Sequence, residues 1–153
     1  MLETMVVASI LSIGAAMAMP NFLMSSARAQ LKQGTKELAG QLGTARMLAM
    51  NRNTTVTVSL TKITCPPSST NCGRLQVSST YTGGGTALPT YVMPAQIVAT
   101  GMDMQIQFNS LGLRSGGGAA NQAMTLRNSK GVTFEVQVTP AGRIRWCPTS
   151  PCT

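Results

Sequence analysis

A long uncharged run near the N-terminus constrains the fold of this chain more than any other feature. Residues 4–27 carry no charged side chain, and a helix of that length can cross a hydrocarbon layer of about 30 Å. A cleaved secretory signal would have a basic segment ahead of its apolar run, but Glu3 stands there instead. The run therefore predicts a retained transmembrane and assembly helix over residues 1–24.

Three features of this run bear on assembly. Alanine, serine and glycine are spread through it, and in lipid such small residues let helices approach closely. Pro20 removes one backbone hydrogen bond, so we expect a kink or a locally melted turn there. Glu3 is an ionisable group at the edge of an apolar segment, where it either lies in the membrane interface or pairs with a partner.

The next segment, residues 25–53, continues at helical period and predicts an amphipathic half of the same helix. Together the two halves give a rod of roughly 75 Å at 1.5 Å per residue. Its apolar residues recur at steps of three, four and seven: Leu31, Leu38, Leu42, Ala45 and Ala49. Three glycines each cost about 1 kcal/mol relative to alanine and fit either close packing or local softness: Gly34, Gly40 and Gly43.

Residues 54–153 predict a β-rich head. Apolar and polar residues alternate over 132–139, as in a strand with one face in the core and one in water. Gly, Pro and Asn separate this segment from six others: 54–60, 74–81, 96–100, 104–109, 123–127 and 143–146. The expected fold class is α+β, with the long N-terminal helix packed on an antiparallel sheet. Glycine triplets at 83–85 and 116–118 lack the residues of phosphate-binding loops and are interpreted as flexible loops.

Composition bounds the function. Twelve Lys and Arg against four Asp and Glu give a formal net charge of +8, which favours anionic partners such as nucleic acid or acidic lipid. Histidine, the commonest general base, is absent, and the four acids are scattered along the sequence. We therefore expect no catalytic residue, no cofactor and no enzymatic activity.

Four cysteines form two short pairs, Cys65 with Cys72 and Cys147 with Cys152. Four cysteines allow three connectivities, and pairing within each short loop is the simplest. A zinc site is the competing interpretation, but the long spacings and the lack of histidine argue against a metal. Two local disulfides are predicted, which would place the head outside the cytoplasm.

The order L-E-T-M-V-V-A-S-I-L-S-I-G-A-A-M-A-M-P-N-F, residues 2–22, closely resembles the N-terminal helix of type IV pilins and type II secretion pseudopilins. In that family a glutamate at the place of Glu3 pairs with the N-terminal amine of a neighbouring subunit during assembly. The resemblance implies a single-pass inner-membrane stage with a periplasmic head, then a pilus of such subunits at the cell surface. The family's basic leader is missing ahead of Met1, so we expect the natural chain to begin earlier.

Three further stretches resemble the GspH/FimT subfamily of these proteins. They are E-L-A-G-Q-L-G-T-A-R-M-L-A-M-N-R-N at 37–53, M-Q-I-Q-F-N-S-L-G at 104–112 and V-T-P-A-G-R-I-R at 138–145. Within the last, G-R-I-R resembles the G-R-x-R motif of FimT proteins, which are implicated in DNA binding during natural transformation. The resemblance implies a type IV pilin-like fold and assigns Gly142, Arg143 and Arg145 to a DNA site.

The chemistry of the arginine pair can be stated independently. In a strand, Arg143 and Arg145 project to one face about 7 Å apart, close to the phosphate spacing of one DNA strand, and each guanidinium can hold a phosphate without reading a base. Charged residues that merely protect an exposed sheet edge are the plain alternative. Trp146, of opposite parity, is expected in the core rather than stacked on a base. Other basic residues extend the candidate surface: Arg114, Arg127, Lys130, Arg74 and Lys62.

Two functions follow from these patterns. The first is a FimT-like minor type IV pilin that binds double-stranded DNA through its phosphates and supports DNA uptake in natural transformation. The second is a structural minor pilin or a GspH-like pseudopilin of the type II secretion system, which needs the helix and Glu3 but no nucleic acid.

Overall fold

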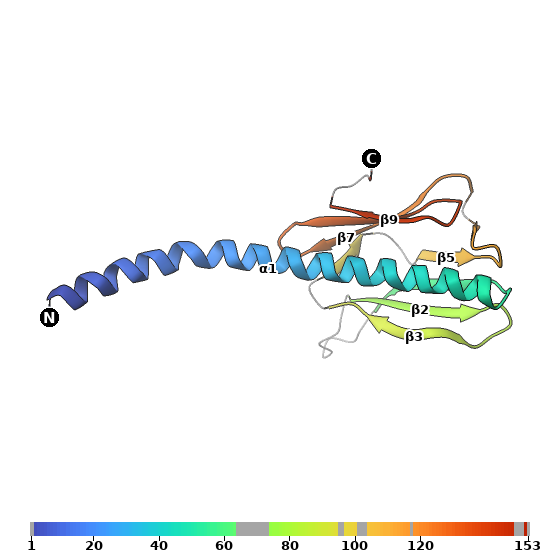
Figure 1. The fold of residues 1–153 in the computed structure, drawn as a ribbon, viewed down its shortest axis with the longest axis horizontal. Coiled ribbons are helices and arrows are strands. Elements are labelled where there is room, and N and C mark those ends of the chain that lie inside the picture. Colours follow the sequence, from blue (N-terminus) through green and yellow to red (C-terminus); the bar gives the residue numbers. More distant parts are fainter. Residues whose placement is uncertain are drawn as a thin grey trace.

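A computed structural model describes residues 2–63, 74–94, 97–100, 104–116, 118–148 and 152 of the 153-residue chain. The first element is one long helix, α1 (Leu2–Asn51). Figure 1 shows its N-terminal half projecting from the head, and its C-terminal half running between two groups of strands. The strands are β1 (Val56–Lys62), β2 (Leu75–Tyr81), β3 (Thr86–Val92), β4 (Ile97–Thr100), β5 (Met104–Phe108), β6 (Arg114–Ser115), β7 (Gln122–Asn128), β8 (Thr133–Val138) and β9 (Ile144–Cys147).

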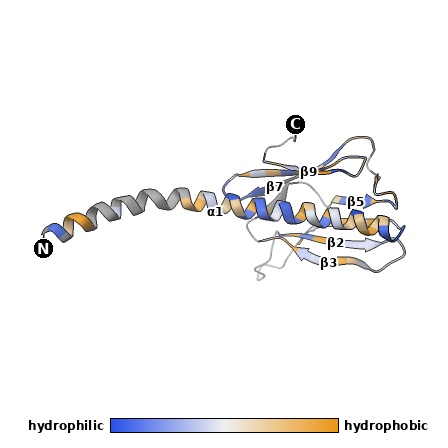
Figure 2. Ribbon diagram, in the orientation of Figure 1, coloured by the Kyte–Doolittle hydropathy of each residue, from blue (hydrophilic) through white to orange (hydrophobic). Residues whose placement is uncertain are grey.

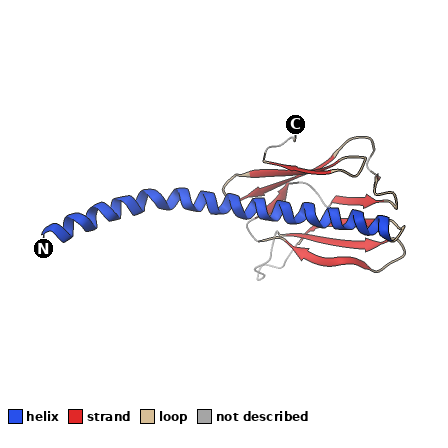
Figure 3. Cartoon of the chain, viewed as in Figure 1, coloured by secondary structure: helices blue, strands red, loops and turns tan. Residues whose placement is uncertain are grey.

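The projecting half of α1 is continuous through Pro20. Figure 3 shows a gradual curve there and no break, so the locally melted turn that was one expectation for Pro20 does not form. In the part of the chain that the structure describes, no helix is long and apolar enough to cross a membrane. The transmembrane segment predicted over residues 1–24 is not confirmed.

The inner half of α1 is held by the apolar stripe that its periodicity predicts. All five residues of the stripe, from Leu31 to Ala49, are completely buried. The helix ends in a hydrogen-bonded cap, because the N–H of Asn53 donates to the carbonyl of Met50 and that of Thr54 donates to Ala49. Asn53 has a φ of 47°, the left-handed conformation that this type of cap requires.

The strands form two antiparallel sheets where a single sheet was expected. One has the order β3-β2-β1-β5-β6 and the other the order β4-β7-β8-β9. α1 contacts strands of both sheets, so its buried stripe belongs to a core shared by both (Figure 1). Gly34 is one reason that the helix can lie so close, because a Cβ there would meet Ile97 of β4 at 2.5 Å.

Two strands were not predicted. β3 contains Pro89 and is mostly exposed, which is compatible with a strand at a sheet edge but gives little apolar alternation. Residues 83–85, expected as a flexible loop, form the tight connection between β2 and β3, and each has a φ near +100°. β6 has only two residues, too few for any periodicity to show.

Candidate nucleic-acid interface

The arginine pair lies at the free edge of the four-stranded sheet. β9 pairs only with β8 in this sheet, with Arg145 opposite Gln137 and Trp146 opposite Val136. Arg143 precedes β9, but its carbonyl accepts a hydrogen bond from the N–H of Thr139 at 2.9 Å, which extends the pairing by one step. Both arginines are exposed, and neither guanidinium hydrogen-bonds to the part of the chain that the structure describes.

Gly142 fixes the position of the turn that precedes the arginine pair. It is buried, and its φ of 73° lies in the left-handed region. A Cβ at this position would overlap the carbonyl oxygen of Gly112, so only glycine lets the turn at 139–142 pack directly on the turn at 109–112. The glycine of the G-R-I-R motif therefore positions the arginines and is not itself a surface contact.

Arg46 of α1 fastens these two turns together. Its Nε donates to the carbonyl of Gly112 at 2.8 Å, and one of its terminal nitrogens donates to the carbonyl of Ala141 at 3.5 Å. The turn before Arg143 is thus tied to the last turns of the long helix. Sequence reasoning missed Arg46, because nothing local relates a helical arginine to a glycine 66 residues later.

A disulfide fixes the chain after the pair. Cys147 and Cys152 are bonded, with their Cα atoms 5.8 Å apart, as predicted. The N–H of Cys152 donates a hydrogen bond to the carboxylate of Glu135, which is only 3 % exposed. The predicted pair Cys65–Cys72 lies outside the described residues. Among the described residues no cluster of His, Cys, Asp or Glu could hold a metal ion.

The additional basic residues do not form one surface with the pair. Arg127 shares the outer face of this sheet with Arg145, since Arg127 is paired with Thr133, which has the same parity as Gln137. Arg127 is on β7, two strands from β9, and its partner Thr133 is four residues from Gln137 along β8. It is therefore displaced from Arg145 by about 13 Å along the strands and by about 10 Å across them. Lys130 is exposed in the β7–β8 turn beyond it. Lys62 and Arg74 belong to the end of β1 and the start of β2, in the other sheet.

The structure does not support the prediction that Arg114 contacts DNA. It was a candidate DNA contact, but it is only 8 % exposed, and its guanidinium donates to the carbonyls of Gly118 and Ala120 and to the side chain of Gln122. Its two terminal nitrogens already have partners inside the protein, whereas its buried Nε has none among the described residues. Arg114 therefore holds the 118–120 loop in place and is not available to a phosphate.

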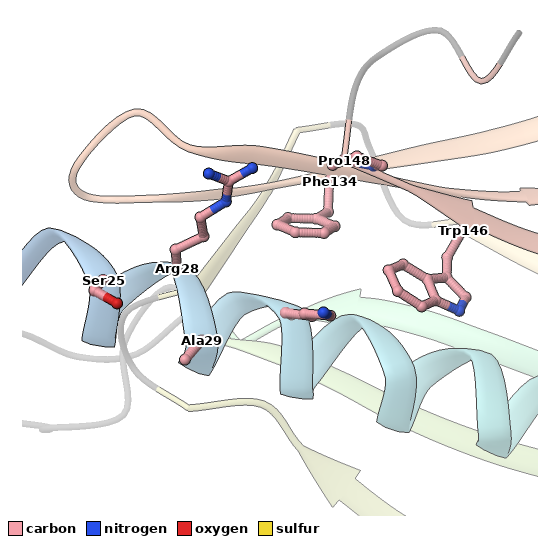
Figure 4. Close-up of a pocket in the computed structure, with 7 residues that line it drawn as sticks. Ser25, Arg28, Ala29, Phe134, Trp146 and Pro148 are labelled. Atoms are coloured by element: carbon pink, nitrogen blue, oxygen red, sulfur yellow. The ribbon is translucent and has the colours of Figure 1, made fainter.

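Trp146 is on the face of β9 that its parity predicts, toward α1, but 37 % of it is exposed, so the predicted core position is wrong. Its ring lies beside that of Phe134, with centroids 6.2 Å apart, and the Nζ of Lys36 lies 5.8 Å from its centroid. Figure 4 shows both rings pointing from the sheet toward the helix. β9 therefore presents arginine on one face and tryptophan on the other.

Comparison with known proteins identifies the fold. Two crystal structures of the type IV minor pilin FimU from Pseudomonas aeruginosa superimpose with TM-scores of 0.56 and 0.57, at 15% and 16% identity. The first comparison covers 80% of this chain and 96% of FimU, and the second 82% and 94%. The predicted type IV pilin fold is thereby confirmed.

Sequence comparison identifies the family. No curated protein matches the chain. Residues 34–142 match the family described as type II transport protein GspH. The match spans more than half of the 153 residues and ends at Gly142, immediately before the arginine pair. The chain therefore belongs to the GspH family of type IV pilin-like proteins.

Proposed function

We propose that this protein is a FimT-like minor type IV pilin that binds double-stranded DNA without sequence specificity and supports DNA uptake in natural transformation. The observation that carries the proposal is the exposed pair Arg143 and Arg145 at a sheet edge. A packed turn precedes the pair and a disulfide follows it. Because the backbone on both sides is held, little conformational entropy is lost when both arginines engage phosphates.

The geometry suits a phosphate backbone better than a base edge. Two residues apart on an extended chain, the guanidinium groups lie about 7 Å from each other, and bidentate hydrogen bonds to successive phosphates carry no sequence information. Arg127, on the same face but two strands away, is proposed to contact a phosphate outside the row that the pair engages. The long helix, with Glu3 exposed in its first turn, is proposed to anchor the subunit in the inner membrane and then to pack with other pilin subunits in the pilus.

The test uses the full chain in mild detergent and labelled duplexes of two unrelated sequences. We expect both duplexes to bind with equal affinity, and the double variant R143Q/R145Q to lose most of this affinity because phosphate contacts dominate binding. The matched control is R28Q/K32Q, which removes the same net charge from α1. Equal loss in both variants would assign the effect to net charge, and loss in the control alone would assign binding to Arg28 and Lys32. Either result would overturn the site.

The second function is a purely structural minor pilin or a pseudopilin, and the match to the GspH family, which ends before Arg143, favours it. It predicts no measurable duplex binding by the full chain at low salt. It also predicts that R143Q/R145Q assembles into filaments and supports secretion or piliation as the unsubstituted chain does.

A further inference from the structure

A groove lies on the opposite side of β9 from the arginine pair. It has a volume of about 470 Å³ and separates the start of the buried half of α1 from β8 and β9. Figure 4 shows Arg28 rising from the helix on the side where Phe134 and Trp146 descend from the sheet. The residues that line it are Ser25, Arg28, Ala29, Lys32, Phe134, Trp146 and Pro148.

The helix side of this groove is cationic and unpaired. Arg28, Lys32 and Lys36 follow one another at intervals of four, which places them in a row on one face of α1 with a rise of about 6 Å between neighbours. All three are exposed. Arg28 and Lys32 form neither a hydrogen bond nor an ion pair with the described residues, and the polar contact of Lys36 there is with the indole of Trp146.

The nearby acids face elsewhere. Glu37 follows Lys36 in sequence, but its charge acts on Tyr91 of the other sheet, where burial and then this carboxylate raise the pKa of the phenol. Glu135 lies on the outer face of its sheet, where its carboxylate accepts a hydrogen bond from the N–H of Cys152. The groove therefore combines two cations with two aromatic rings, with Lys36 close to one of the rings, and an anionic group would complement it.

The groove continues into an exposed apolar surface. Phe22, Leu23 and Met24, immediately before Ser25, are 73 %, 55 % and 52 % exposed. Figure 2 shows this apolar stretch where α1 leaves the head. A ligand that fits both parts has an anionic head and an apolar tail, and tryptophan with lysine or arginine is the side-chain combination found where proteins meet a lipid headgroup layer.

We propose that this groove binds the headgroup of an anionic phospholipid while the chain is anchored in the membrane. The phosphate lies between Arg28 and Lys32, the acyl chains lie along residues 22–24, and Trp146 lines the groove on the other side of the phosphate, beside Lys36. The proposal rests on the membrane-anchored stage of the proposed function but not on DNA binding. A stacked nucleobase is less favoured, because Lys36 already occupies a position over the indole ring.

Trp146 is the single tryptophan of the chain and reports on the groove directly. The full chain in detergent micelles is titrated with phosphatidylglycerol that carries a nitroxide at the headgroup end of an acyl chain, and separately with phosphatidylcholine labelled in the same way. A nitroxide quenches indole fluorescence at short range without direct contact, so a headgroup held in the groove quenches Trp146. Since each basic residue near an anionic lipid surface favours binding appreciably, we expect half-quenching at about a tenfold lower mole fraction of phosphatidylglycerol. R28Q/K32Q removes this preference.

The control is R143Q/R145Q, which loses the same charge but keeps the preference. Equal quenching by both lipids, or an unchanged preference in R28Q/K32Q, overturns the lipid site. So does an unlabelled oligothymidylate that displaces phosphatidylglycerol and binds R28Q/K32Q more weakly, since the groove is then a nucleic-acid site. A failed lipid site leaves duplex binding by Arg143 and Arg145 intact, and failed duplex binding leaves the lipid preference intact.

Discussion

Arginine residues have different roles in two regions of the head. Where turns and loops meet the end of α1 and β6, Arg46 and Arg114 donate to backbone carbonyls and hold the chain in place. At the edge strand, Arg143 and Arg145 point into solvent and are free to engage a ligand. The difference shows that a high positive charge overstates a binding surface, because a guanidinium that donates to backbone carbonyls is not available to neutralise a phosphate.

The largest loss of stability is expected for Arg114→Ala. The carbonyls of Gly118 and Ala120 lose their donor in a partly buried site, so we expect a loss of about 3 kcal/mol in the free energy of unfolding. The measurement is guanidinium chloride unfolding of the full chain in detergent, followed by Trp146 fluorescence. Arg127→Ala, exposed on the outer face of a sheet, is the control and should change stability by less than about 0.5 kcal/mol. Equal losses of unfolding free energy in the two variants would contradict the distinction between structural and solvent-exposed arginines.

Gly142→Ala is expected to cost about 2 kcal/mol, from left-handed strain and from the overlap with the Gly112 carbonyl. Gly116→Ala is the matched control, since its φ of 77° is similar but an added Cβ meets nothing within 4 Å. It should cost only about 1 kcal/mol. Gly142→Ala should also weaken duplex binding, because the turn that aims Arg143 must move; unchanged binding would show that this turn does not position the pair.

Arg46→Ala removes the donor shared by the two turns, and we expect it to destabilise the fold by about 1.5 kcal/mol. Arg52→Ala is a fair comparison, because Arg52 lies only six residues away on the chain and its guanidinium lies over the exposed side of Tyr81, 4.9 Å from the ring centroid. That contact is worth about 0.5 kcal/mol. If thermal unfolding shows the two variants to be equal, Arg46 does not fasten the turns.

The smallest stability effect is expected at the binding pair. Arg143→Ala and Arg145→Ala leave no buried group without a partner, so each should change the free energy of unfolding by less than about 0.5 kcal/mol. A larger loss, measured by the same unfolding assay, would show that these arginines are structural. The proposed binding site would then have to be sought at other residues.

Sequence patterns predicted the parts of the fold that depend on local periodicity. The buried stripe of α1 and the opposite parity of Arg145 and Trp146 follow from the helical and strand repeats alone. The contact of Gly142 with Gly112 and the role of Arg46 could not be predicted, because each joins residues far apart in sequence. Arg114 was misjudged for the same reason: its burial depends on contacts with the 118–120 loop, and a basic residue directly ahead of a serine and three glycines looks exposed.

The salt dependence of duplex binding tests the central claim most directly. Affinity of the full chain in detergent is measured between low and moderate salt, for the unsubstituted protein and for R143Q/R145Q. Each phosphate neutralised contributes about 0.9 to the slope of log K against log salt, so the variant should lose about 1.8 from the slope, while R28Q/K32Q keeps it. An unchanged slope in R143Q/R145Q would contradict the assignment of the phosphate contacts to this pair.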